Sequence, residues 1–174
     1  MYFIQNEIDI SNDNDVNRAL KNINISLSSK NIVLLNGVDV NIEIRQKQVT
    51  NYVSKVSAIP IVRDKMVELQ RTMSDNHNVV LEGRDIGTRV FPNTNYKFFL
   101  SATLGIRGKR RFDELLKQGE NPSLSQVIDE IERRDIADST REHSPLKKAV
   151  DAIEIDTSSM KIEQHVYVIV SKIN

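Results

Sequence analysis

Apolar residues recur three or four positions apart in several parts of the chain, which is the spacing of an amphipathic helix. In the segment 61–74, which follows Pro60, the residues on one such face are Ile61, Val62, Met66, Leu69 and Met73. We predict further helices over 16–23, 46–58, 102–118, 123–134 and 161–173. Ser11 is expected to cap the helix that starts near it, with Asp13 and Asp15 in the first turn.

Other parts of the chain show the patterns of β-strands. Ile23, Ile25 and Leu27 alternate with polar residues, a turn is predicted over 28–31, and 32–35 form the return strand. Asn36-Gly37 then predicts a tight hairpin turn. Together these features predict a small antiparallel β unit.

Three short segments are predicted to be strands, and the first two are typical of strands that are buried on both faces. They are 79–81, 96–100 and 152–155, and they alternate with predicted helices. This alternation predicts an α/β protein with a parallel sheet and flanking helices. The β-rich segment 23–45 is then an insert in that fold.

Composition narrows the classes of function. The 174 residues carry 24 basic and 24 acidic side chains, and aromatic residues make up 5%. A neutral chain with few aromatic residues argues against a nucleic-acid binder. No apolar run reaches the roughly 18 residues of a membrane span, and the N-terminus does not resemble a signal peptide. We therefore expect no membrane or nucleic-acid partner and a cytoplasmic location.

The stretch VVLEGRDIGTRVFP places Glu82, Arg84 and Asp85 directly after a predicted buried strand. Ligands bind at this end of the strands in open α/β sheets. Gly83 and Gly87 would let the backbone approach a ligand, and the planar guanidinium of Arg84 suits a phosphate. A surface loop in which Arg and Asp pair with each other is the alternative.

Two further stretches are rich in arginine. EIERRDIADSTREHSPL contains Arg133, Arg134 and Arg141 among aspartates, and it continues into a polar segment that we predict to be irregular and mobile. Mobile arginines that close over phosphates are used by phosphoryl transferases, whereas a solvated helix face is the plainer interpretation. RGKRR places three arginines on one face of a helix, where a basic surface is again the alternative. They are Arg107, Arg110 and Arg111.

In order and spacing, these stretches closely resemble the bacterial cytidylate kinases, which are nucleoside monophosphate kinases with a P-loop. The matching segments are VVLEGRDIGTRVFPNTNYKFFLSAT, RGKRRFDELLKQG, EIERRDIADSTREHSPLKKAVDAIEIDTS and the insert NGVDVNIEIRQKQVTNYVSKVSAIPIVR. The resemblance implies phosphate transfer from ATP, with Mg2+, to CMP or dCMP. It does not distinguish these two acceptors, and it does not settle whether UMP is accepted.

The resemblance also implies roles for single residues. Ser54, Arg63, Asp85 and Arg141 resemble the groups that read the cytosine ring. Arg134 and Asp138 resemble the pair that contacts the ribose, and Arg84 resembles an arginine that binds the transferred phosphate. We therefore expect Arg84, Arg134 and Arg141 to be catalytic. The ATP side would be the basic helix with Arg107, Arg110 and Arg111.

One family element has no match in this sequence. The Gly-rich loop that ends in Gly-Lys-Ser/Thr does not occur, and the one Gly-Lys pair, Gly108-Lys109, lies inside a predicted helix. Met1-Tyr2 resembles the end of another family element, but Phe3 stands where arginine is expected. We therefore expect the N-terminal P-loop unit to be absent. The competing hypotheses are a cytidylate kinase, with this chain as given expected to be incomplete for catalysis, and a non-catalytic CMP-binding fragment without an ATP site.

The resemblance divides the chain into five parts with different expected roles. They are a core remnant at 1–22, a CMP-binding insert at 23–60, an α/β core at 61–134, a lid at 135–146 and a C-terminal core segment at 147–174. A sheet without its P-loop strand would expose an apolar edge, so self-association through that edge is expected.

Overall fold

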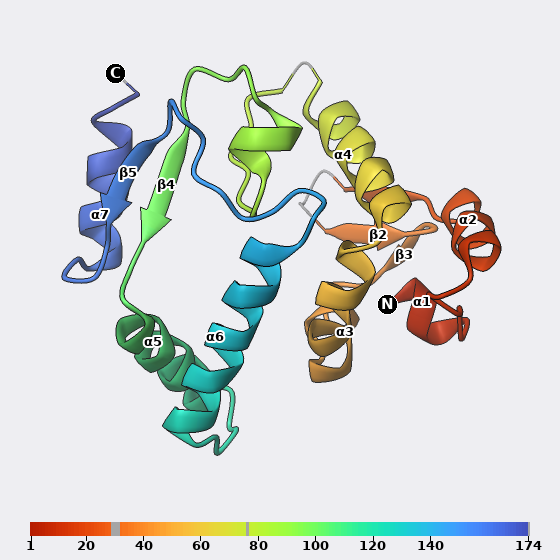
Figure 1. Cartoon of the computed structure of the whole chain (residues 1–174), viewed down its shortest axis with the longest axis horizontal. Coiled ribbons are helices and arrows are strands. Elements are labelled where there is room, and N and C mark those ends of the chain that lie inside the picture. The colour runs from red at the N-terminus through yellow and green to blue at the C-terminus, as the bar shows by residue number, and fades with distance from the viewer. Residues whose placement is uncertain (29–31, 76, 174) are drawn as a thin grey trace. The chain divides into compact units, whose positions relative to one another are not determined.

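The computed structural model describes residues 1–28, 32–75 and 77–173 (Figure 1). The chain forms two compact units, Met1–Val80 and Leu81–Asn174, and each is described here by itself. Helices, an antiparallel sheet and a parallel strand pair occur together, so the α/β fold class predicted from the sequence is confirmed. The finer division into core, insert and lid stays a prediction.

The first unit combines helices with a three-stranded antiparallel sheet. Its elements are α1 (Tyr2–Gln5), α2 (Asp13–Lys21), β1 (Ile25–Leu27), β2 (Val33–Leu35), β3 (Val38–Asp39), η1 (Glu43–Arg45), α3 (Lys47–Ser57) and α4 (Pro60–Ser74). The strands follow the order β1-β2-β3, with Leu35 opposite both Ile25 and Val38. Asn36 and Gly37 have φ angles of 50° and 83°, as a tight hairpin turn of this kind requires, so the predicted turn is confirmed.

The core of the first unit lies between α1, α2 and α4. Its buried members are Phe3, Val16, Ala19, Leu20 and Val62. Removing their apolar surface from water is the main stabilising contribution to this unit. Proline at the first position of α4 fits a helix start, because that N–H has no partner within the helix.

Ser11 is not the cap of α2, which corrects the sequence prediction. The cap is Asn12, whose side-chain oxygen accepts hydrogen bonds from the N–H groups of Asn14 and Asp15. Ser11 instead donates its hydroxyl to Asp9 at 2.7 Å. Serine and asparagine can both cap a helix. Here the hydroxyl of Ser11 is used in the turn with Asp9, so Asn12 is the cap.

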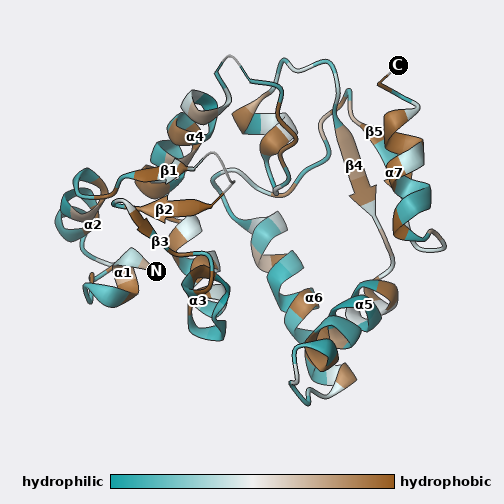
Figure 2. Cartoon of the chain, turned by 180° about the vertical axis from the view of Figure 1, so that it is seen from behind, coloured by the Kyte–Doolittle hydropathy of each residue, from teal (hydrophilic) through white to brown (hydrophobic). Residues whose placement is uncertain are grey.

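The second unit holds the parallel strand pair. Its elements are η2 (Ile86–Val90), β4 (Phe98–Ser101), α5 (Leu104–Lys117), α6 (Leu124–Thr140), β5 (Ile153–Asp156) and α7 (Ile162–Val170). β4 and β5 pair in parallel from Phe98↔Ile153 to Ser101↔Asp156, and α7 lies alongside them (Figures 1 and 2). In Figure 2, most of β4 and part of α7 are coloured as apolar.

α5 and α6 pack closely because α5 carries a glycine at the contact. A Cβ atom on Gly108 would lie 2.4 Å from a side-chain carbon of Ile128. Gly108 is buried within α5, so the only Gly-Lys pair of the sequence is part of a helix, as predicted, and belongs to helix packing.

Two element predictions were wrong. Residues 79–81 form no strand, and the side chain of Val80 is fully exposed. A short apolar run becomes a strand only when neighbouring strands supply backbone partners, and no such strand pairs with it in the described chain. The segment after 134 is not irregular throughout, because α6 continues to Thr140. The turn predicted over 28–31 lies mostly outside the described residues.

Candidate functional site

Three predicted site residues come together around the carboxylate of a fourth, Asp138. Its side chain is only 8% exposed, and it accepts a 2.7 Å hydrogen bond from Nε of Arg84. A nitrogen of Arg134 and a nitrogen of Arg141 each lie 3.8 Å from its oxygens. We call Arg84, Arg134, Asp138 and Arg141 the arginine cluster.

The end of α6 positions three members of this cluster. Arg134 and Asp138 are four residues apart on the helix, and Arg141 follows directly after its last residue. Arg141 donates from Nε to the carbonyl oxygen of Ser144 at 2.7 Å, and the N–H of Leu146 donates to the carbonyl of Asp138. The chain therefore curls back on the helix end and holds the side chain of Arg141, which is 12% exposed.

The cluster is positively charged overall, because three guanidinium groups surround one carboxylate. The side chains of Arg84 and Arg134 are 41% and 47% exposed, so a ligand can reach them. Arginine binds two oxygens of a phosphate at once through its planar fork. The arrangement is therefore suited to an anionic ligand of the phosphate type.

Asp85 is positioned by the turn that follows Arg84. It is 1% exposed, and its carbonyl oxygen accepts hydrogen bonds from the N–H groups of Arg89 and Val90 at 2.8 and 3.2 Å. The glycines around it also serve internal packing. A Cβ on Gly83 would lie 3.0 Å from Ile86, and a Cβ on Gly87 would lie 3.4 Å from Cδ of Lys97.

The three arginines of α5 have three different partners. Arg107 binds Asp135 of α6 and the carbonyl of Ala102. Arg110 donates to the hydroxyl and the carbonyl of Thr157, which ties α5 to the segment after β5. Arg111 pairs with Glu114 on the surface at 2.8 Å. Their predicted role on the ATP side stays a prediction, and each makes an ion pair or hydrogen bond within the second unit.

Ser54 and Arg63 lie in the first unit. Ser54 is on α3, where its carbonyl accepts from the hydroxyl of Ser57, and Arg63 is in the first turn of α4. Both side chains are half-buried. That these two residues read a cytosine ring together with Asp85 and Arg141 of the second unit stays a prediction.

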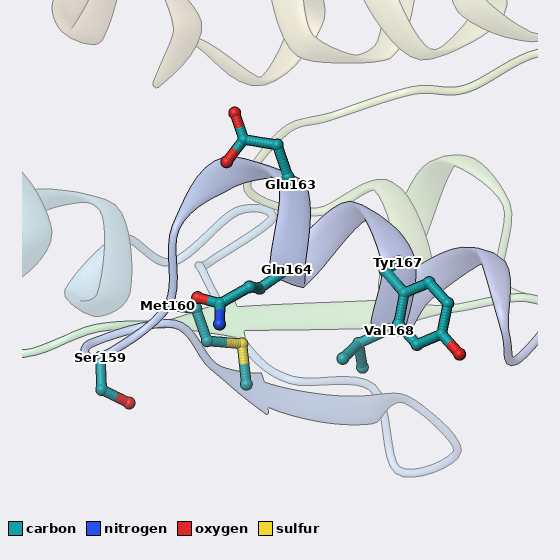
Figure 3. A pocket seen from close by; sticks show the side chains of 6 residues that line it. All are labelled: Ser159, Met160, Glu163, Gln164, Tyr167 and Val168. Atoms are coloured by element: carbon teal, nitrogen blue, oxygen red, sulfur yellow. The ribbon is translucent and has the colours of Figure 1, made fainter.

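A pocket in the second unit shares no residue with the arginine cluster (Figure 3). It lies against α7 and is lined by Ser159, Met160, Glu163, Gln164, Tyr167 and Val168. Its one charged side chain is a carboxylate, so it does not suit a phosphate.

The described residues contain neither a cluster of metal ligands nor a helix that could span a membrane. Among residues 1–28, 32–75 and 77–173, no three His, Cys, Asp or Glu side chains are grouped so that they could hold a metal ion. In the same ranges, no helix combines the length and the apolar character that crossing a membrane requires.

The sequence analysis missed the ion pair between the buried Lys97 and the exposed Asp151. Lys97 directly precedes β4, its side chain is 5% exposed, and it binds Asp151 at 2.6 Å. A lysine inside a run predicted to be a buried strand was the available signal, because a buried charge requires a partner.

Comparisons with known proteins agree with the resemblance found in the sequence. A family model described as cytidylate kinase matches residues 1–174. The cytidylate kinase of Fusobacterium nucleatum is 44% identical over 173 residues, which cover 99% of this chain and 79% of that protein. The cytidylate kinase of Clostridioides difficile is 47% identical, and the match covers 98% of this chain and 79% of that protein. The cytidylate kinase of Cytophaga hutchinsonii is 46% identical, and the match covers 95% of this chain and 73% of that protein. The chain therefore belongs to the cytidylate kinase family.

Proposed function

We propose that the protein transfers phosphate from ATP to CMP or dCMP, and that the arginine cluster binds the acceptor nucleotide. The observation that carries the proposal is the group of three arginines around the buried carboxylate of Asp138. Its members occupy the positions at which the sequence resembles the nucleotide-binding motifs of the family. The family assignment favours this enzymatic function over a non-catalytic CMP-binding fragment.

The proposed chemistry depends on charge and position. Phosphoryl transfer needs phosphates held in line and their charge neutralised, with little covalent help from the protein. Arg84, which is 41% exposed beside Asp138, would bind the phosphate of CMP. Arg134 and Arg141 would add positive charge next to it as the transferred group develops negative charge.

Asp138 can act on a nucleotide without releasing Arg84. A carboxylate has about four lone-pair sites, and the 2.7 Å bond from Arg84 uses one of them. In our proposal another site accepts a hydrogen bond from a ribose hydroxyl, with Arg134 beside it. Ser54, Arg63, Asp85 and Arg141 would supply donors and acceptors for the cytosine ring.

The described residues do not fit a magnesium ion held by the protein alone, since they contain no group of three suitable ligands. Magnesium commonly keeps several waters and binds substrate phosphates with one or two carboxylates. The ion would therefore come with ATP, and we derive no step through it. Arg107, Arg110 and Arg111 are proposed for the ATP side, although each has a protein partner.

The proposed substrates are metabolites of the cytoplasm, so we place the protein there. Its formal charge is zero, so the charge balance offers no general attraction for nucleic acid. Self-association through the β4–β5 pair is also part of the proposal, because these strands carry exposed apolar side chains such as Leu100 and Ile153.

An assay of ADP release tests the proposed function. We expect the protein with ATP and magnesium to release ADP only when CMP or dCMP is added. AMP and GMP are the matched controls, because they carry the same phosphate on a purine. ADP release at equal rates with all four acceptors, or with none of them, would contradict the proposal.

A further inference from the structure

Lys97 is a charged residue in an almost fully buried place. It directly precedes β4, and its side chain is 5% exposed. Its ammonium group donates to the carbonyl oxygen of Pro92 and to Oδ2 of Asp151, the latter at 2.6 Å. The hydrogen bond from Lys97 lowers the pKa of Asp151, as expected for a carboxylate paired with a cation.

Packing alone does not explain a lysine at this position. Taking a charge out of water is costly, and an apolar side chain of similar volume often serves stability as well or better. Asp151 is 65% exposed and sits at the surface, so the pair connects a buried strand end to an outer turn. Such a pair fixes geometry, because the ammonium group must meet two oxygens at once.

The geometry that Lys97 fixes belongs to the segment with Arg84 and Asp85. The lysine stem packs against Gly87, where an added Cβ would lie 3.4 Å from Cδ of Lys97. Its ammonium group holds Pro92, just beyond the other end of η2. Lys97 therefore contacts both ends of the 86–92 turn, whose hydrogen bonds start at the carbonyl of Asp85.

The backbone adds a second connection to the same place. The N–H of Ile153 donates to the carbonyl of Lys97 at 2.9 Å, so β5 is tied to the residue that holds the turn. Ala149 also packs near Gly87, with its Cβ 3.7 Å from where a glycine Cβ would be. The 86–92 turn, the 149–152 turn and the strand pair meet at this one side chain.

We propose that Lys97, held by Asp151, is a positioning residue that orients Arg84 and Asp85 for the acceptor nucleotide. This inference rests on the proposed function of the arginine cluster. It assigns Lys97 no contact with substrate. Its effect passes through the 86–92 turn, which sets the direction of the two side chains that precede it.

The test is Lys97→Met, which keeps the length of the side chain and removes its charge. Two quantities are measured, namely the Kd for CMP by calorimetry and amide exchange along the chain. We expect the Kd to rise about tenfold or more, as for the loss of a hydrogen bond to a charged group. Exchange should become faster at the amides of Arg89, Val90 and Phe91, while β4 and β5 stay protected.

Two variants control for charge loss and for stability. Lys148→Met removes the lysine of the exposed Lys148–Glu154 pair, which joins the same part of the chain at 2.7 Å. We expect it to change neither readout. Leu115→Ala truncates a buried residue of α5 and should lower Tm without changing the Kd for CMP. A general loss of stability would affect Leu115→Ala and Lys97→Met alike.

Asp151→Asn tests whether the pair acts as one unit. Its effect on Kd should be smaller than that of Lys97→Met, because Pro92 still accepts from the ammonium group. Added to Lys97→Met, it should change little, since the interaction is already gone.

An unchanged Kd for CMP in Lys97→Met would overturn the positioning role. So would a rise in Kd that Leu115→Ala shows to the same extent when the two variants lose equally in Tm. If the unmodified chain does not bind CMP, the proposed function fails. The exchange data test the role of Lys97 independently of CMP binding. Unchanged protection of residues 89–91 in Lys97→Met would show that Lys97 does not hold the turn.

Discussion

Asp138 has more cationic neighbours than its single charge can balance. Three arginine side chains lie within 4 Å of its oxygens, and its own side chain is almost buried. In the free protein the carboxylate holds the arginines near one another against their mutual repulsion. In our proposal, this excess positive charge is what binds the phosphate of the nucleotide.

Replacing Asp138 by Asn should therefore reduce stability. The change keeps the shape, but it weakens the charged hydrogen bond from Arg84 and leaves three cations close together. We expect the free energy of unfolding to fall by about 1–3 kcal/mol, as for the loss of a buried hydrogen bond to a charged group. Urea unfolding measures this.

Asp113→Asn is the matched control. It removes an aspartate from the exposed pair with Lys109, and such a pair contributes about 0.2–0.5 kcal/mol. If the free energy of unfolding falls equally in the two variants, the arginines around Asp138 interact mainly with water, and the prediction is wrong.

Arg141→Ala and Arg63→Ala should weaken binding of CMP more than binding of ATP. The prediction follows from their proposed place beside the cytosine ring, where losing a charged donor typically costs about 2–5 kcal/mol. Equilibrium titration with each nucleotide measures the difference. Arg111→Ala, which removes a surface arginine paired with Glu114, is the control. If both nucleotides lose affinity equally in Arg141→Ala and Arg63→Ala, the assignment to the base is wrong.

Part of the arginine cluster could be predicted from the sequence, but the role of Lys97 could not. Arginine and aspartate at i and i+4 on a predicted helix already place Arg134 beside Asp138. The meeting of Arg84 with Asp138, 54 positions away, depends on tertiary structure. The resemblance assigned both residues to the nucleotide site but predicted no contact between them. The pairing of Lys97 with Asp151 was not predicted, because a single lysine in an apolar run does not indicate which residue is its partner.

At the scale of elements, the contact between α5 and α6 depends on one missing side chain. Gly108 lets Ile128 approach the α5 backbone, which brings Arg107 of α5 to Asp135 of α6. Glycine is an unfavourable residue inside a helix, by about 1 kcal/mol relative to alanine. Its presence here is explained by the close approach.

Gly108→Ala should destabilise the protein although alanine favours helices. A Cβ at 2.4 Å from Ile128 must push the helices apart, and such overpacking costs about 1–3 kcal/mol. Thermal unfolding measures the effect. In Gly105→Ala, the control in the same helix, the new Cβ meets nothing within 4 Å and stability should rise slightly. A stabilised Gly108→Ala would contradict the packing described for α5 and α6.

Elements with a strong local signal were predictable. The Asn36-Gly37 turn, the helix after Pro60 and the strand at 98–101 follow from turn chemistry and periodicity. The run 79–81 was not predictable in this way, because a strand exists only when another strand pairs with it. The length of α6 was underestimated because its last turns are polar and are held by the contacts of Arg134 and Arg141 with Asp138.

At the scale of the whole molecule, the parallel strand pair is unusually small. Parallel sheets are normally covered on both faces, whereas here the sheet of the described second unit has two strands. Leu100 and Ile153 are 51% and 40% exposed, and unpaired strand edges are templates for further pairing. This is the physical basis for the proposed self-association.

We expect the chain to sediment as a concentration-dependent dimer, and Leu100→Lys to shift it toward the monomer. A lysine on an edge strand opposes pairing with a second copy. Leu116→Lys is the control, since Leu116 is similarly exposed on α5, outside the strand pair. A compact monomer at all concentrations would contradict the proposal.

Recognition of CMP by the arginine cluster can be tested by one titration. CMP is titrated into the chain and into Arg84→Ala, with AMP and GMP as competitors of equal charge. We predict saturable CMP binding that the purine nucleotides do not match, and a loss in Arg84→Ala of about tenfold or more. AMP bound as tightly as CMP, or an unchanged affinity for CMP in Arg84→Ala, would contradict it.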